Sequence, residues 1–74
     1  MIYSKRIRLL REEKAKNQSE IAKVLGKSQQ GYAHLENDNA KISVDDLITL
    51  CKYYNVTADY ILGLTDEIKE LPKK

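Results

Sequence analysis

Apolar residues in this chain recur three or four positions apart, the spacing of α-helices, and no stretch of six alternates as a β-strand does. Short turns divide this pattern, and we expect helices over about residues 4–14, 18–25, 29–37, 44–54 and 58–62. Each segment begins at a polar residue that can cap free backbone amides, namely Ser4, Asn17, Ser28, Ser43 and Thr57. Gly26 and Gly63 stand where two of the helices should end. The sequence therefore predicts an all-α domain, a compact five-helix bundle.

The chain is long enough for one small domain only. It has 74 residues, 42% of them hydrophobic, and a domain of this size buries only about 60% of the surface that its unfolded chain exposes. The single cysteine, Cys51, rules out an intrachain disulfide, and without a Cys/His cluster we expect no structural zinc. The fold should rest on packing alone, or be supported by a second copy of itself.

Neither a membrane span nor a secretory signal is expected. No run approaches the roughly 18 apolar residues that a spanning helix needs, and no apolar segment follows the first basic residues. A lone thiol in an apolar stretch fits a reducing compartment. We therefore expect a cytoplasmic protein.

The charge is unevenly distributed along the chain. Residues 1–41 hold nine Lys or Arg against five Asp or Glu, a net charge of +4, whereas residues 42–74 hold four against six, a net charge of −2. A basic half on a small domain suggests an anionic partner such as nucleic acid, although ordinary solvated surfaces often carry such a charge.

The most informative stretch is residues 18–37. Two predicted helices of about eight residues are separated there only by Gly26-Lys27-Ser28. So short a turn favours a crossing angle near 90–120°, the helix-turn-helix geometry. Gly26 would supply the positive φ of the turn, and Ala22 would allow close approach. The residues expected to face one another inside the angle are Ile21, Leu25, Tyr32 and Leu35.

Residues 18–30 (QSEIAKVLGKSQQ) and 35–37 (LEN) resemble the DNA-binding domain of the Cro and lambdoid phage-repressor family, also called the XRE family. The resemblance extends from residue 7 to residue 63 in order and spacing. It implies a lambda-repressor-like fold, with residues 1–64 as the DNA-binding domain and 65–74 as a tail. It also implies double-stranded DNA as partner and a bacterial or phage-encoded protein that associates with the nucleoid. From the residues themselves we expect no metal and no cofactor.

The resemblance implies a role for each matching residue. Gln29 and Gln30 match residues at the start of a recognition helix that read base edges in the major groove, and His34 matches a further contact. An amide side chain offers a donor and an acceptor together, which suits the edge of adenine, and it can also donate to guanine. Contacts to the DNA backbone are implied for Asn17, Gln18, Ser28, Tyr32, Asn37, Asn39 and Lys41.

Two further roles are structural. Arg11 and Glu36 match a family pair that forms a largely buried ion pair between the first and third helices. Tyr32 is more readily a core residue than a phosphate ligand, although a hydroxyl at the rim could serve both roles. The chain departs from the family at Gly31, inside the recognition helix, and at Asp38, which would repel phosphate if it faced DNA.

Apolar residues after position 52 exceed what one small core can bury. We therefore expect a homodimer, joined through the fifth helix and the tail, which could add a turn of helix through Ile68 and Leu71. The candidate contacts are Tyr60, Ile61, Leu64 and Ile68. Two copies related by a two-fold axis would read both halves of a palindromic operator.

The leading hypothesis is a sequence-specific DNA-binding transcriptional regulator, a repressor that occludes a promoter. The alternative is a protein–protein interaction module on the same fold, antitoxin-like or antirepressor-like, and Gly31 and Asp38 favour it. An enzyme is not expected, because the one His and the one Cys fall on different predicted helices and no phosphate-binding glycine loop is present. We expect no small-molecule ligand.

Overall fold

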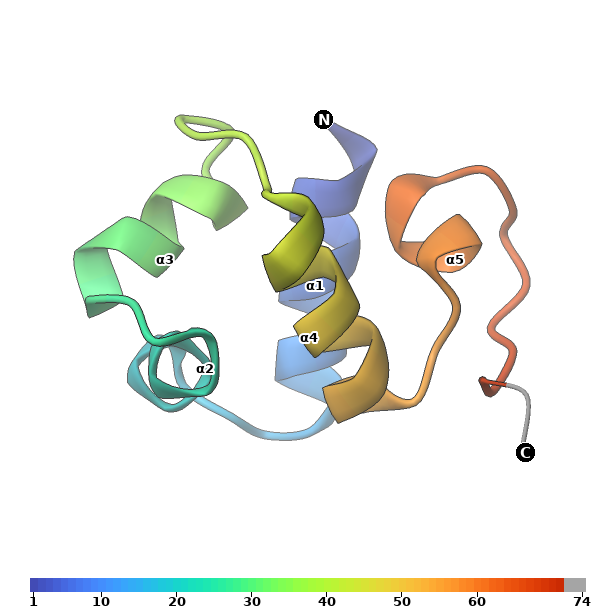
Figure 1. Ribbon diagram of the computed structural model, residues 1–74, viewed down its shortest axis with the longest axis horizontal. Helices are drawn as coiled ribbons and strands as arrows, with labels where there is room; N and C mark the ends of the chain where they lie inside the picture. The colour runs from blue at the N-terminus through green and yellow to red at the C-terminus, as the bar shows by residue number, and fades with distance from the viewer. Residues whose placement is uncertain (72–74) are drawn as a thin grey trace.

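The computed structural model describes residues 1–71 and is all-helical over that range (Figure 1). Its elements are α1 (Ile2–Glu13), α2 (Gln18–Leu25), α3 (Gln29–Glu36), α4 (Val44–Tyr54) and α5 (Ala58–Leu62). None of the helices in this described range is long and apolar enough to cross a membrane. The predicted all-α, five-helix architecture is confirmed over these residues.

Local capping signals explain where four of the helices begin. Asn17 Oδ1 accepts from the Glu20 amide at 2.8 Å while Glu20 Oε1 accepts from the Asn17 amide at 3.1 Å, a complete capping box. Gly26 ends α2 in the left-handed conformation, at φ +68°. The capping side chains that begin the other three helices are Ser28, Ser43 and Thr57. All four predicted N-caps are therefore confirmed.

The predicted start of the first helix was wrong. The helix α1 begins at Ile2, and Ser4 lies inside it with 1% of its surface exposed. The Ser4 hydroxyl is not used as a cap because it donates to Asp38 Oδ1 at 2.6 Å, and the Met1 ammonium group approaches the same oxygen at 2.5 Å. The Ser4 hydroxyl thus bonds to Asp38 in a distant loop and does not cap the helix.

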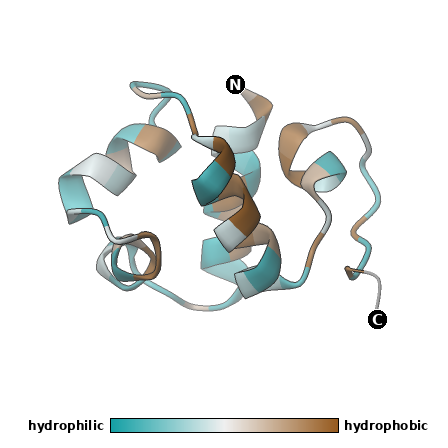
Figure 2. Cartoon of the chain, in the orientation of Figure 1, coloured by the Kyte–Doolittle hydropathy of each residue, from teal (hydrophilic) through white to brown (hydrophobic). Residues whose placement is uncertain are grey.

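Every helix contributes one fully buried side chain to a single core. These residues, each with no exposed surface, are Ile7, Ile21, Tyr32, Leu50 and Ile61. Burying a large apolar side chain contributes about 1.5–3 kcal/mol. Each helix carries both hydrophobic and hydrophilic residues, and the outer end of α3 is hydrophilic (Figure 2). The core thus holds α3 by one side and leaves its other side in solvent.

The predicted turn of helix in the tail is absent from the described residues 64–71. Gly63, at φ +81°, ends α5, and the Thr65 hydroxyl then accepts from the Glu67 amide at 3.2 Å. Such local side-chain bonds compete with helix formation. The segment runs back along the domain instead, and residues 72–74 of the predicted tail lie outside the described residues (Figure 1).

Arg6 of α1 attaches this segment to the domain. Its Nη1 donates to the carbonyl oxygens of Tyr60 at 3.2 Å and Thr65 at 3.1 Å, and its Nη2 pairs with Asp66 Oδ1 at 2.6 Å. The guanidinium carbon also lies 4.3 Å from the centre of the Tyr60 ring, within the range of a cation–π contact. One side chain of the first helix therefore holds the end of the last helix and the residues beyond it.

Two of the four predicted dimer contacts are unavailable to a second copy. Ile61 is fully buried in the core and Tyr60 is buried under Arg6, so their assignment to an interface was wrong. The number of apolar residues after position 52 was misleading because α1 packs against α5 and buries Tyr60 and Ile61. Leu64 and Ile68 are exposed, at 74% and 57%, and their role as contacts stays a prediction.

Candidate nucleic-acid interface

The helices α2 and α3 pack against each other across a three-residue turn and form a helix-turn-helix unit (Figure 1). The Lys27 amide donates to the Ala22 carbonyl at 2.8 Å and closes the turn behind Gly26. Ala22 itself is 2% exposed, as expected for the point where the two helices approach each other. An ion pair also joins the unit to α4, because Lys27 Nζ lies 3.1 Å from Asp46 Oδ2.

The two sides of α3 have opposite character. Tyr32, Leu35 and Glu36 face inward and are buried. Gln29, Gln30 and His34, the residues predicted to read bases, are all exposed on the outer side. Gln30 and His34 are four residues apart and so share one face of the helix. This outer side is polar, whereas the inner side packs in the core.

Gln29 has a partner that the sequence did not suggest. Ser19, the second residue of α2, donates its hydroxyl hydrogen bond to Gln29 Oε1 at 2.8 Å. Gln30 and His34 make no side-chain hydrogen bond within the described residues. The two neighbouring glutamines are therefore not equivalent.

The predicted ion pair between Arg11 and Glu36 is present and bidentate. Arg11 Nε lies 2.7 Å from Glu36 Oε2 and Arg11 Nη2 lies 3.0 Å from Oε1. Gln18 Nε2 also donates to Glu36 Oε1 at 3.2 Å. Arg11 Nη1 donates to the Lys16 carbonyl oxygen at 2.9 Å. The Glu36 side chain is only 1% exposed. This cluster fastens the C-terminal end of α3 to α1 and α2.

Each member of this ion pair stabilises the charged form of the other. Burial alone raises the pKa of the Glu36 carboxyl, but its polar neighbours, chiefly the hydrogen-bonded Arg11, outweigh burial and hold that pKa below its ordinary value. The hydrogen bond to Glu36 raises the pKa of Arg11. Both groups are therefore charged across the physiological pH range.

Tyr32 cannot contact DNA, so that predicted role was wrong. The residue has no exposed surface, and burial raises the pKa of its hydroxyl well above the ordinary value. The hydroxyl lies near Glu36, yet within the described part of the chain it has no hydrogen-bond partner of normal geometry. Its ring volume serves the core, as the sequence also allowed.

The other residues predicted to contact the DNA backbone fall into two groups. Asn17, Gln18 and Ser28 use their side chains within the protein, the first and last as helix caps and Gln18 on Glu36. The second group lies exposed in the segment after α3 and consists of Asn37, Asn39 and Lys41. Unlike the first group, these three side chains are not used in helix caps or in the cluster around Glu36.

The departures from the family pattern at Gly31 and Asp38 have local explanations. A Cβ atom at Gly31 would lie 3.2 Å from Ser28 Oγ, tighter than an ordinary contact, so glycine makes room for the cap of its own helix. Asp38 turns toward Ser4 and the N-terminus of α1. These contacts lower the pKa of Asp38, chiefly through the hydrogen bond from the Met1 ammonium group. Neither residue therefore argues against a nucleic-acid surface on α3.

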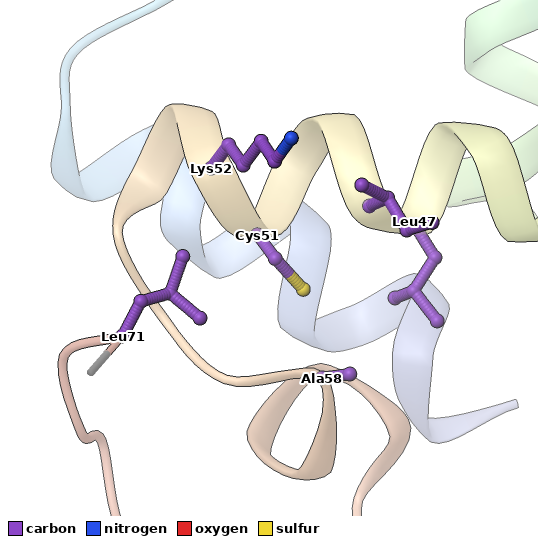
Figure 3. Close-up of a pocket in the computed structure, with 6 residues that line it drawn as sticks. Leu47, Cys51, Lys52, Ala58 and Leu71 are labelled. Carbon is purple, nitrogen blue, oxygen red and sulfur yellow. The ribbon is translucent and has the colours of Figure 1, made fainter. Parts of the chain in front are cut away.

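A separate hollow of about 240 Å³ lies between α4, α5 and the returning segment (Figure 3). It is lined by Leu47, Ile48, Cys51, Lys52, Ala58 and Leu71. Burial raises the pKa of the Cys51 thiol, which keeps it neutral. This lining is apolar apart from Lys52 and the Cys51 thiol.

The comparisons with known proteins agree with this architecture. A helix-turn-helix family model matches residues 7–61. The chain is also 35% identical over 66 residues to the uncharacterized HTH-type transcriptional regulator YobD of Bacillus subtilis (strain 168). This match covers 89% of the chain and 59% of the relative, so the chain spans well under two thirds of that protein's length. No solved structure matches the chain significantly.

The chain belongs to the XRE-type helix-turn-helix family. The matched range includes all of α2 and α3 and the whole buried cluster around Glu36. The resemblance identified from residues 18–37 is thereby confirmed.

Proposed function

We propose that the protein is a sequence-specific DNA-binding transcriptional regulator, a repressor that reads a palindromic operator as a homodimer. The observation that carries this proposal is the two-sided character of α3. Its inner side is fixed by the core and by the Arg11–Glu36 pair, and its outer side presents Gln29, Gln30 and His34 to solvent. Family membership supports the same conclusion.

The chemistry of the exposed residues suits the major groove. Glutamine amides can donate to guanine or pair with the donor and acceptor of adenine. Lys41, Asn37 and Asn39 follow α3 in an exposed segment and would bind phosphate oxygens, which position a protein without reading sequence. Occupation of a promoter would then be enough to repress it.

A single recognition helix reads too few base pairs to define one genomic site. Two copies with helices about 34–36 Å apart would read successive major grooves on one side of the duplex. Leu64 and Ile68 offer exposed apolar surface in the segment after α5, and this segment lies on the opposite side of the domain from α3 (Figure 1). We expect the dimer contact there, where it leaves the recognition helix free.

Selection of duplexes from a random library, followed by sequencing, tests the proposal directly. The wild-type protein should enrich a palindrome, and Gln30→Ala should relax one position in each half-site by about 1–3 kcal/mol. The variant should fold normally because Gln30 is exposed. Failure to enrich any sequence, or a monomer in sedimentation with and without the selected duplex, would contradict the proposal.

Lys41→Ala tests the phosphate contacts. The plot of log binding constant against log salt should become shallower by about 0.9 for each phosphate that the variant no longer neutralises, and affinity should fall equally for selected and unrelated duplexes. Lys52→Ala is the matched control, because Lys52 is also exposed but lies beside the hollow between α4 and α5. Equal slopes for wild type and Lys41→Ala would remove Lys41 from the interface.

The alternative, a protein–protein module without DNA binding, no longer has its two supporting features. Gly31 and Asp38 have the local explanations given above. Salt separates the two functions, since binding to generic duplex should weaken steeply as salt rises, whereas an apolar protein contact should not.

A further inference from the structure

We infer that Ser19 determines which base Gln29 selects, by holding the Gln29 side chain so that it donates hydrogen bonds to DNA and does not accept them. Ser19 is thus a positioning residue for base reading. This inference rests on the proposed function, because it names how one residue of that surface achieves its specificity.

The geometry places the two side chains in direct contact across the helix-turn-helix angle. Ser19 is the second residue of α2 and Gln29 is the first residue of α3. The 2.8 Å bond from Ser19 Oγ to Gln29 Oε1 uses the only proton of the hydroxyl. Ser19 is half-buried and Gln29 is exposed, so the bond lies at the edge of the surface that would face DNA.

The amide group is planar, so holding its oxygen also orients its nitrogen. With Oε1 turned toward α2, the NH₂ group of Gln29 points away from Ser19, and within the described residues it has no partner. The side chain therefore presents its two donors to a ligand, while Oε1, one of whose two lone pairs accepts from Ser19, faces α2.

This arrangement of donors and acceptor on the Gln29 amide discriminates between bases. Adenine presents an acceptor and a donor in the major groove, and glutamine pairs with both only when its own oxygen and nitrogen both face the base. Guanine presents two acceptors, N7 and O6, which need donors alone. Gln29 held by Ser19 should therefore prefer guanine to adenine, whereas Gln30, with no such partner, is free to bind either.

The test uses the duplex that the wild-type protein selects and a set of its single-base variants. Gln29→Ala first identifies the position that Gln29 reads, as the one where preference disappears. At that position Ser19→Ala should shift the guanine-to-adenine affinity ratio toward adenine by about fivefold or more, the lower bound for one good bidentate pair. Ser19→Thr keeps the hydroxyl and should keep the wild-type ratio.

A double variant separates positioning from a direct contact. Where Gln29 is already alanine, Ser19→Ala should leave every base preference unchanged, because Ser19 acts only through the Gln29 amide. In the free protein, NMR relaxation of the Gln29 side-chain NH₂ should show greater mobility in Ser19→Ala than in wild type.

The outcomes that overturn the inference differ from those that overturn the function. If the wild-type protein selects no sequence, the proposed function fails and the inference fails with it. If a palindrome is selected but Ser19→Ala leaves the base ratio unchanged, or weakens binding equally to all duplexes, Ser19 does not position Gln29. The same holds if Gln29→Ala alters no position, and in both cases sequence-specific binding stands.

Discussion

Replacing Glu36 with alanine should lower the free energy of unfolding by about 3–5 kcal/mol, because Arg11 would keep a charge in a mostly buried site without its partner. Chemical denaturation followed by far-ultraviolet circular dichroism measures this loss. The double variant Arg11→Ala/Glu36→Ala should cost less than the two single losses together, since residues in contact are coupled. Additive losses would show that the two side chains act independently.

Tyr32→Phe is the matched control for this experiment. This substitution removes the buried Tyr32 hydroxyl, which lies beside Glu36. That hydroxyl has no hydrogen-bond partner of normal geometry among the described residues. The loss should therefore be small compared with that of Glu36→Ala. A loss as large in both variants would mean that disruption of the core, and not the ion pair, explains the effect.

The same pair should make stability depend on pH. The folded-state pKa of Glu36 is lowered, so its contribution is fully present above the ordinary carboxyl pKa and is lost as the pH falls through the folded value. Glu36→Gln should flatten this acidic part of the stability profile.

Arg6→Ala should destabilise the domain by about 2–3 kcal/mol, the next largest expected effect, since hydrogen bonds from charged groups are worth about 1.5–3 kcal/mol. The substitution removes two bonds to carbonyl oxygens and the contact over Tyr60, and so releases the end of α5. Thermal and chemical denaturation both measure it.

Asp66→Ala isolates the exposed part of the Arg6 contacts. The Asp66 side chain is 97% exposed, so its ion pair should contribute less than about 1 kcal/mol. If Arg6→Ala were no more harmful than Asp66→Ala, the bonds to the carbonyl oxygens would not be holding the chain in place.

Features that depend on neighbouring residues could be predicted from the sequence, whereas those that depend on distant ones could not. The start of α2 at Asn17 follows from a cap and a glutamate three residues apart. Ser4 has the same chemistry as the true caps, but its partner Asp38 lies 34 residues further along the chain. Likewise, a surplus of apolar residues does not reveal that α1 covers Ile61.

In the candidate site too, the sequence predicts the features that depend on neighbouring residues and not those that depend on distant ones. Exposure of Gln29 and Gln30 follows from helical periodicity once Tyr32 and Leu35 are assigned to the core. The bond between Ser19 and Gln29 depends on how two helices meet and which rotamers their side chains adopt. No pattern of neighbouring residues contains that information.

The packing of α1 against α5 also affects how the protein is made. A chain emerging from the ribosome completes the helix-turn-helix before α5 exists, yet α1 then lacks the cover that α5 gives it. Arg11 of α1 anchors α3, and Arg6 reaches Thr65 and Asp66. We therefore expect a nascent chain to hold its recognition helix less firmly until α5 and the segment beyond it have been translated.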